Sequence, residues 1–268
     1  MGVASVSAAA RTAPVVERPA AIEPTGVDTS VGKALAILDE LGTAKSLGVS
    51  ALARRTELPK STVFRLLARL EERGYVERLG KEYCLGRRLF ELGNQIAACR
   101  PSGLRDIALP YLTELYERTH YIVHLAILDG VEVLYLEKLF GRDPTRAPSH
   151  VGRRVPAACC GLGKAMLAFS DQALVTEVLG EGLKRHTPYT IAVEQLFLEE
   201  LARIRDAGVA FDREEVAVGL TCVAAPILID GRAVAAVSVS GPTARFDPET
   251  MVNPVRRAAA AIAQHLQA

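Results

Sequence analysis

The chain has 268 residues, of which 49% are hydrophobic and 24% are charged, and its formal net charge is +1. This balance is typical of a globular protein and excludes wholesale disorder, while the length favours two domains. The sequence contains no apolar run of the ~18 residues that span a bilayer. Its first 30 residues carry neither the basic start nor the apolar stretch of a secretory signal. We therefore expect a protein of the cytoplasm that makes no contact with a membrane.

The charged residues are distributed unevenly along the chain. Residues 31–90 hold 12 Lys/Arg against 7 Asp/Glu, whereas residues 91–268 hold 18 Lys/Arg against 21 Asp/Glu. A small basic module followed by a larger, slightly acidic one predicts a polyanionic partner at one end of the chain only.

The first elements of the chain are predicted to be helices. Residues 1–29 are rich in Ala, Pro and Val and are predicted to form a disordered tail. Ser30 can cap a helix that runs from Val31 to about Leu41, and Ser50 can cap a short helix over residues 51–56. Glu57, Leu58 and Pro59 are predicted to form the turn before the next helix.

The third predicted helix, residues 60–73, carries the clearest pattern. Four apolar residues fall at i, i+3, i+4 and i+7 and form one stripe for a core, and the opposite side is basic and carries hydroxyl groups. After this helix, residues 75–78 and 82–85 read as two strands joined by a Gly-containing turn. Three helices and a hairpin predict a winged helix-turn-helix; the alternative is an unrelated three-helix bundle. The stripe consists of Val63, Leu66, Leu67 and Leu70.

DNA binding would use the polar side of this helix and the hairpin. Arg65 and Thr62 can donate hydrogen bonds to base edges in the major groove, and the first residues of the helix can hold a phosphate. The hairpin presents basic residues to the DNA backbone or to the minor groove. The candidate DNA-binding residues are Lys60, Ser61, Thr62, Arg65, Arg69, Arg78 and Lys81.

The rest of the chain predicts a linker and an α+β domain. A helix over residues 87–100 is followed by a break at residues 100–103, which marks a domain boundary at about residue 104. We thus divide the chain into a DNA-binding domain (30–88), a linker helix (89–103) and a second domain (104–268). In the second domain, two hairpins on Asp-Gly turns alternate with helices. The predicted hairpins are 122–128/131–139 and 221–229/232–240, the helices are 104–120, 161–169, 193–207 and 248–266, a single strand covers 209–212, and Pro110 is a possible kink.

Cysteine usage argues against a disulfide framework and against a zinc site. The five cysteines are an odd number, and none stands in a CxxC pair. We expect reduced, buried thiols, no metal and no cofactor. The cysteines are Cys84, Cys99, Cys159, Cys160 and Cys222.

These segments resemble the IclR family of bacterial transcriptional regulators, and the resemblance covers about residues 30–266. It implies a winged-helix DNA-binding domain, a linker helix and a GAF-like antiparallel-sheet domain that binds a small effector. It also implies a homodimer or a tetramer at a palindromic operator, with DNA contacts at Lys60, Ser61, Thr62 and Arg65. The matching segments are SVGKALAIL (30–38), LPKSTVFRLL (58–67), YCLG (83–86), VGRRVP (151–156), GKAMLA (163–168), GLTCVAAP (219–226) and SVSGP (238–242).

The resemblance also implies an effector pocket between the helix that begins near Gly161 and the facing strands. Backbone N–H groups at that helix start favour an anion, and Ser238 and Ser240, two apart on a strand, face the same side. Asp212 can accept a hydrogen bond from a ligand hydroxyl. The pocket floor, Ala-Cys-Cys at 158–160, is small and soft, so aliphatic and aromatic acids both stay open. The candidate effector residues are Cys160, Gly161, Leu162, Asp212, Cys222, Ser238 and Ser240, with Arg142 or Arg146 as a further carboxylate contact.

The sequence therefore predicts a ligand-responsive transcriptional regulator, a repressor or an activator, and not an enzyme. One alternative is a thiol-based redox sensor that uses Cys159 and Cys160. A second is a cysteine-dependent enzyme with Cys160 as the nucleophile and His124 or His150 as the base. The segment Gly161-Leu162-Gly163-Lys164 suggests a phosphate-binding loop, which is rejected because Ala158 stands in place of the first Gly and Ala165 in place of the final Ser/Thr.

Overall fold

The computed structural model describes residues 29–99, 102–141, 147 and 149–268 of the chain. It divides into two units, one ending at Leu92 and one beginning at Gly93. The predicted disordered tail, apart from Thr29, lies outside the described residues, as do Arg142 and Arg146.

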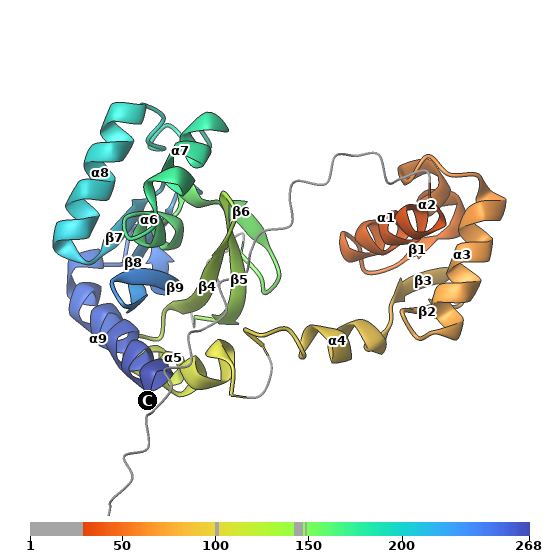
Figure 1. The fold of residues 1–268 in the computed structure, drawn as a ribbon, viewed down its shortest axis with the longest axis horizontal. Helices are drawn as coiled ribbons and strands as arrows, with labels where there is room; N and C mark the ends of the chain where they lie inside the picture. The colour runs from red at the N-terminus through yellow and green to blue at the C-terminus, as the bar shows by residue number, and fades with distance from the viewer. Residues whose placement is uncertain (1–28, 100–101, 142–146, 148) are drawn as a thin grey trace, which may run out of the picture. The chain divides into compact units, whose positions relative to one another are not determined.

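The first unit is a winged helix-turn-helix, as the sequence predicts (Figure 1). Its three strands form one antiparallel sheet in the order β1-β3-β2, with the β2–β3 hairpin as the wing. The elements are α1 (Ser30–Gly42), β1 (Leu47–Gly48), α2 (Val49–Arg55), α3 (Lys60–Glu72), β2 (Val76–Leu79) and β3 (Glu82–Leu85).

Two predicted helix caps are wrong, each for a local reason. Thr29 caps α1, because its Oγ1 accepts a hydrogen bond from the Gly32 N–H at 3.0 Å, so Ser30 is already helical. Helix α2 begins directly after Gly48 without a side-chain cap, so Ser50 lies inside it. The segment before α2 forms strand β1, which the sequence analysis missed because two residues carry no periodicity.

The core of the first unit is formed by the apolar sides of α1, α2 and α3. Ile37, Leu52, Val63 and Leu67 are fully buried at its centre. Val63 and Leu67 belong to the predicted stripe of α3, and their burial turns the opposite side of α3 to solvent.

Helix α4 (Arg87–Gly93) is shorter than the predicted helix over residues 87–100. It ends at Gly93, and Asn94 is the next residue. Both residues are weak helix formers, Gly by about 1 kcal/mol relative to Ala. The apolar spacing of residues 89–96 is therefore not sufficient to continue the helix.

The second unit is built on a six-stranded antiparallel sheet in the order β6-β5-β4-β9-β8-β7. Its hairpins are the two that the sequence predicts, and Pro110 does not interrupt the first helix. The elements are α5 (Leu104–Thr119), β4 (Ile122–Asp129), β5 (Glu132–Leu139), β6 (Arg154–Pro156), the 3₁₀ turn η2 (Ala157–Cys159), α6 (Gly161–Leu167), α7 (Gln172–Gly180), α8 (Glu194–Ala207), β7 (Ala210–Arg213), β8 (Leu220–Ile229), β9 (Arg232–Pro242) and α9 (Pro248–Gln267).

Helices cover both faces of this sheet (Figure 1). On one face, α5 and α9 pack against residues such as Val237 and Val239 of β9. On the other face, α6, α7 and α8 pack against residues that include Ala224 and Ala236. Since neighbouring residues of a strand point to opposite faces, the same strands supply both cores.

Three elements of the second unit were not predicted. β6 and η2 have three residues each, too few to carry a period. Helix α7 does carry a signal that the analysis passed over, because Val175 and Val178 are buried three residues apart.

Candidate functional site

The exposed side of α3 consists of two parallel rows of side chains. Lys60, Phe64 and Ala68 form one row at i, i+4 and i+8, and all three are exposed. Ser61 and Arg65 begin the second row, which Arg69 ends; these are exposed too. Thr62 lies on the flank and is half-buried. This arrangement gives the helix a basic, hydroxyl-bearing surface of the kind that enters the major groove.

Two of the predicted DNA-binding residues, Arg69 and Arg78, interact with neighbouring groups of the same unit, and a third, Lys81, lies at the turn of the wing. The Arg69 Nη1 is 2.9 Å from the Glu72 Oε2 in an exposed ion pair. The Arg78 Nε donates to the Gly80 carbonyl at 3.0 Å, and its guanidinium lies 5.9 Å from the centre of the Tyr83 ring. Lys81 is exposed at the turn of the wing.

In the second unit, the seven predicted effector residues line one small cavity of about 30 Å³. It lies between the start of α6 and the sheet, and its volume is close to that of one or two water molecules. The cavity contains hydroxyl, thiol, carboxyl and backbone groups from separate segments. The seven residues are Cys160, Gly161, Leu162, Asp212, Cys222, Ser238 and Ser240.

The strand register explains why these side chains meet. Asp212 on β7 is opposite Cys222 on β8, and Cys222 is opposite Ser240 on β9. Ser238 is opposite His124 on β4. Directly opposite residues point to the same face of a sheet, so the five side chains form a polar patch under α6.

Helix α6 approaches the sheet and η2 closely because two of its residues are glycines. A Cβ on Gly161 would lie 3.4 Å from the Cys222 Sγ, and one on Gly163 would lie 2.1 Å from the Ala157 carbonyl oxygen. The second distance is incompatible with a side chain. The Cys160 Sγ caps the helix by accepting a hydrogen bond from the Gly163 N–H at 3.3 Å.

Three further polar residues line the cavity that the sequence analysis did not place there: His124, Tyr135 and Ser149. The His124 Nε2 is 2.8 Å from the Ser149 Oγ, and its Nδ1 is 3.3 Å from the Ser238 Oγ. The Tyr135 hydroxyl has no hydrogen-bond partner among the described residues. Tyr135 therefore offers the cavity an unused donor.

Burial controls the protonation of the cavity. It lowers the pKa of His124 to about 3, with a smaller contribution from Lys138, so the imidazole is neutral. Burial also raises the pKa of Asp212 to about 7, with the nearby Glu215 carboxylate adding to the effect. The pKa of the Tyr135 hydroxyl is raised as well, chiefly by burial, so it stays protonated.

A buried lysine lies behind the cavity rather than in it. Lys164 of α6 is fully buried. Its Nζ donates a hydrogen bond to the Glu215 carboxylate and lies 3.8 Å from the Glu200 Oε1. The Glu215 N–H in turn donates to the Asp212 Oδ1 at 2.7 Å. Lys164 thus holds the loop after β7 in place, and among the described residues that line the cavity there is no cationic side chain.

The two cysteine-based alternatives gain no support from this geometry. Burial raises the pKa of Cys159 to about 12 and the pKa of Cys160 well above its ordinary value. Both thiols are therefore held in the unreactive protonated form. His124, with its lowered pKa, is a weak base, and His150 is exposed with its Nδ1 3.0 Å from the Val151 carbonyl oxygen.

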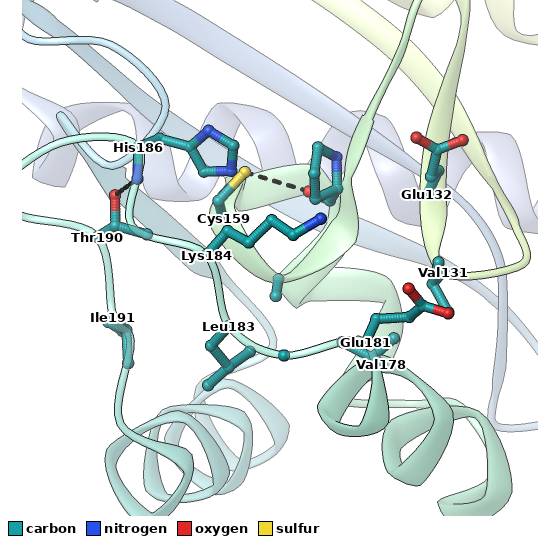
Figure 2. A pocket seen from close by; sticks show the side chains of 13 residues that line it. Val131, Glu132, Cys159, Val178, Glu181, Leu183, Lys184, His186, Thr190 and Ile191 are labelled. Atoms are coloured by element: carbon teal, nitrogen blue, oxygen red, sulfur yellow. Dashed lines mark hydrogen bonds between the residues drawn. The ribbon is translucent and has the colours of Figure 1, made fainter.

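A larger cavity, of about 290 Å³, is lined in part by η2 and by the loop after α7 (Figure 2). Cys159 lies at its base, where the thiol donates to the Pro156 carbonyl. The Lys184 side chain extends into the cavity, and Glu132 and Glu181 line the opposite wall. The sequence analysis did not predict this cavity, because it depends on the loop between α7 and α8.

Among the described residues, no helix is both long and apolar enough to cross a membrane. In the same part of the chain, no cluster of three or more His, Cys, Asp or Glu side chains is arranged to hold a metal ion.

Comparison with known proteins gives matches to both units. A model described as "IclR helix-turn-helix domain" matches residues 30–80, and one described as "Bacterial transcriptional regulator IclR C-terminal" matches residues 96–265. The HTH-type transcriptional regulator XynR of Escherichia coli (strain K12) is 35% identical over 229 residues, which cover 84% of this chain and 90% of XynR.

Two solved structures extend the comparison to the fold. The crystal structure of the Thermotoga maritima IclR superposes with a TM-score of 0.76 at 32% identity and covers 89% of this chain and 99% of that one. An IclR homolog from Microbacterium hydrocarbonoxydans, solved in complex with 4-hydroxybenzoate, gives a TM-score of 0.80 at 28% identity and covers 87% of this chain and 99% of that one.

Proposed function

The chain belongs to the IclR family of bacterial transcriptional regulators, and we propose that it binds a palindromic operator under the control of a small organic acid. In this proposal, residues 30–88 are the DNA-binding domain, 89–103 the linker, and 104–268 the effector-binding and oligomerisation domain. The protein acts in the cytoplasm as a homodimer or a tetramer.

The observation that supports the effector site is that the seven residues implied by the family resemblance line one cavity. They come from α6, β7, β8 and β9. The Tyr135 hydroxyl has no hydrogen-bond partner among the described residues, so a polar ligand in the cavity can accept a hydrogen bond from it. We prefer this cavity to the larger one beside η2, whose rim combines opposite charges at the exposed Lys184 and Glu181.

The chemistry of the cavity favours an organic acid held by neutral donors. The donors are the hydroxyls of Tyr135, Ser238 and Ser240 and the backbone N–H groups of Gly161 and Leu162, which have no partner inside the helix. Because α6 has only seven residues, these donors matter more than its dipole. The bound 4-hydroxybenzoate of the Microbacterium relative supports a carboxylic acid as the class of ligand.

The size of the cavity favours a short acid over a ring. A cavity of about 30 Å³ must enlarge to admit even a small ligand, which requires the lining side chains to rotate. A two- to four-carbon oxo- or hydroxy acid requires a smaller enlargement than a benzoate does. We propose that such an aliphatic acid is the effector.

On the DNA side, Lys60, Ser61 and Thr62 would contact phosphates and Arg65 a guanine, with Arg69, Arg78 and Lys81 alongside. The two-fold symmetry of a dimer would match the palindrome, with half-sites about one helical turn or a multiple of it apart. Val31 and Leu35, one turn apart on α1 and 71% and 54% exposed, offer an apolar surface to a second copy.

Effector binding would change the spacing of the paired DNA-binding domains. An acid that binds one arrangement better than the other shifts the equilibrium between the two, and the affinity for DNA changes with it.

The test measures binding of the full-length protein to the DNA upstream of its own gene and to a scrambled duplex across a salt series. We expect a preference for the native fragment and an affinity that falls steeply with salt. Glyoxylate, pyruvate, lactate and 4-hydroxybenzoate, added in turn, compare aliphatic with aromatic acids. If none of these acids changes the DNA affinity or binds in calorimetry, the effector proposal is wrong. Equal binding of both duplexes at every salt, with and without acid, would refute the operator proposal.

A further inference from the structure

We propose that Phe64 contacts the 5-methyl group of a thymine in the operator and thereby sets part of the DNA sequence preference. This proposal rests on the proposed function, because it requires α3 to enter the major groove.

Phe64 is a large apolar side chain on a surface whose other side chains, apart from the methyl group of Ala68, are polar or charged. It is 57% exposed, and it is the one exposed large hydrophobic residue of α3. The other such residues of the first unit lie on α1, on the β2–β3 hairpin and on α4. Single exposed hydrophobic residues are common, so the exposure of Phe64 matters through its position.

That position is the centre of the surface that faces the DNA in the proposed function. Lys60 and Ala68 lie one turn before and one turn after Phe64 in the same row, and Arg65 is its neighbour in the adjacent row. Ala68 carries only a methyl group, so the ring is not crowded from that side. Phe64 also makes no ring contact with another aromatic or cationic side chain among the described residues.

A phenyl ring in the major groove can recognise one kind of base. Of the four bases, thymine alone presents an apolar methyl group there, at C5. Phe64 has no donor or acceptor, so contact with the other base edges would remove water from them without a replacement hydrogen bond. The structure therefore assigns Phe64 to a thymine and Arg65 to a base with acceptors.

The helix geometry places the two contacts close together. Consecutive residues rise by about 1.5 Å along a helix, less than half of the ~3.4 Å rise of one base pair. We expect each half-site to contain a thymine within about one or two base pairs of the guanine that Arg65 contacts.

The experiment compares the DNA preferences of the full-length wild-type protein, F64A and a control, F90A. Each would enrich duplexes from a random library at the same salt. Wild type should enrich one thymine at a fixed place in each half-site, and F64A should lose that preference while it keeps the others. F90A removes a phenyl ring that is 73% exposed on α4 and should keep the thymine.

A second measurement removes the methyl group alone. Replacing the enriched thymine by deoxyuridine keeps the base pair and should weaken wild-type binding about four-fold per half-site, as expected for one buried methyl group. F64A should bind the two duplexes equally.

Two outcomes would overturn the role of Phe64 and leave the proposed function intact. One is enrichment of the same thymine by F64A. The other is that wild type binds the thymine duplex and the deoxyuridine duplex with equal affinity, at whichever thymine the replacement is made. If wild type enriches no sequence, the operator proposal fails, and this proposal fails with it.

Discussion

Replacing Asp212 by Asn tests the electrostatics of the effector cavity directly. Burial and the neighbouring Glu215 raise the pKa of the Asp212 carboxyl from 3.8 to about 7 in the folded protein. Between these two values the folded state holds a proton that the unfolded state has released, so stability falls as the pH rises from about 4 to about 7. A difference of about 3 in pKa corresponds to about 4 kcal/mol in the free energy of unfolding. This contribution is lost as the pH rises to about 7 and is absent above it.

Asp212→Asn should remove the pH-dependent loss of stability and leave the other contacts of this side chain in place. The Asn carbonyl can still accept the hydrogen bond that the Glu215 N–H gives to the Asp212 Oδ1. The stability of D212N relative to wild type should thus rise by about 1.4 kcal/mol per pH unit between pH 4 and 7 and stay constant above. Asp206→Asn, at an exposed position of α8, is the matched control and should show no such slope.

Urea unfolding measures this difference, at one protein concentration and from pH 5 to pH 8.5. The chain has no Trp, so far-ultraviolet circular dichroism is a suitable signal. A total rise below about 1 kcal/mol for D212N relative to wild type would refute the reasoning that Asp212 is protonated in the folded protein near neutral pH.

Four further predictions concern the two sites. Tyr135→Phe should weaken binding of the organic acid about ten-fold in calorimetry, as the loss of a hydrogen bond to a charged group implies, with unchanged thermal stability; an unchanged Kd would remove Tyr135 from the site. Acid binding should be weaker at pH 8 than at pH 6, because ionised Asp212 repels a carboxylate, and a flat profile would contradict this. Arg65→Ala should cost about 1–3 kcal/mol on the operator and less on random DNA, whereas Lys60→Ala should weaken both alike, as a binding titration on the two duplexes would measure. Gly163→Ala should lower the free energy of unfolding by about 1–3 kcal/mol or more, since its Cβ would lie 2.1 Å from a carbonyl oxygen; an unchanged unfolding midpoint would argue against that packing.

The elements with a clear period could be predicted from the sequence. The stripe that includes Val63 and Leu67 fixes which side of α3 is buried, and that in turn fixes which residues are exposed. In the second unit, Ser238 and Ser240 lie on the same face of β9, as their spacing of two residues requires. Local periodicity is sufficient for these conclusions because each involves a single element.

The residues that were missed reach the cavity through long-range order. Tyr135 and His124 line it only because β5, β4 and β9 are neighbours in the sheet, which no single segment specifies. A bulge at Leu136 shifts the register, so that Lys138 comes to lie opposite His124 and its Nζ donates to the Ser149 carbonyl at 2.6 Å. Lys164 was also missed, because a fully buried lysine is rare and is stable only with partners such as Glu215.

Strand β9 has a consequence for how this protein can acquire a new ligand. Alternate residues of the strand serve two purposes: Val237 and Val239 pack under α5 and α9, and Ser238 and Ser240 line the cavity. A single substitution at either serine changes the cavity and leaves the apolar core intact, so ligand preference can diverge between relatives at little cost to folding. An inserted or deleted residue in β9 would exchange the two sets, burying hydroxyls under the helices and valines beneath α6. Selection on this strand should therefore tolerate point changes at Ser238 and Ser240 and reject any change in its length.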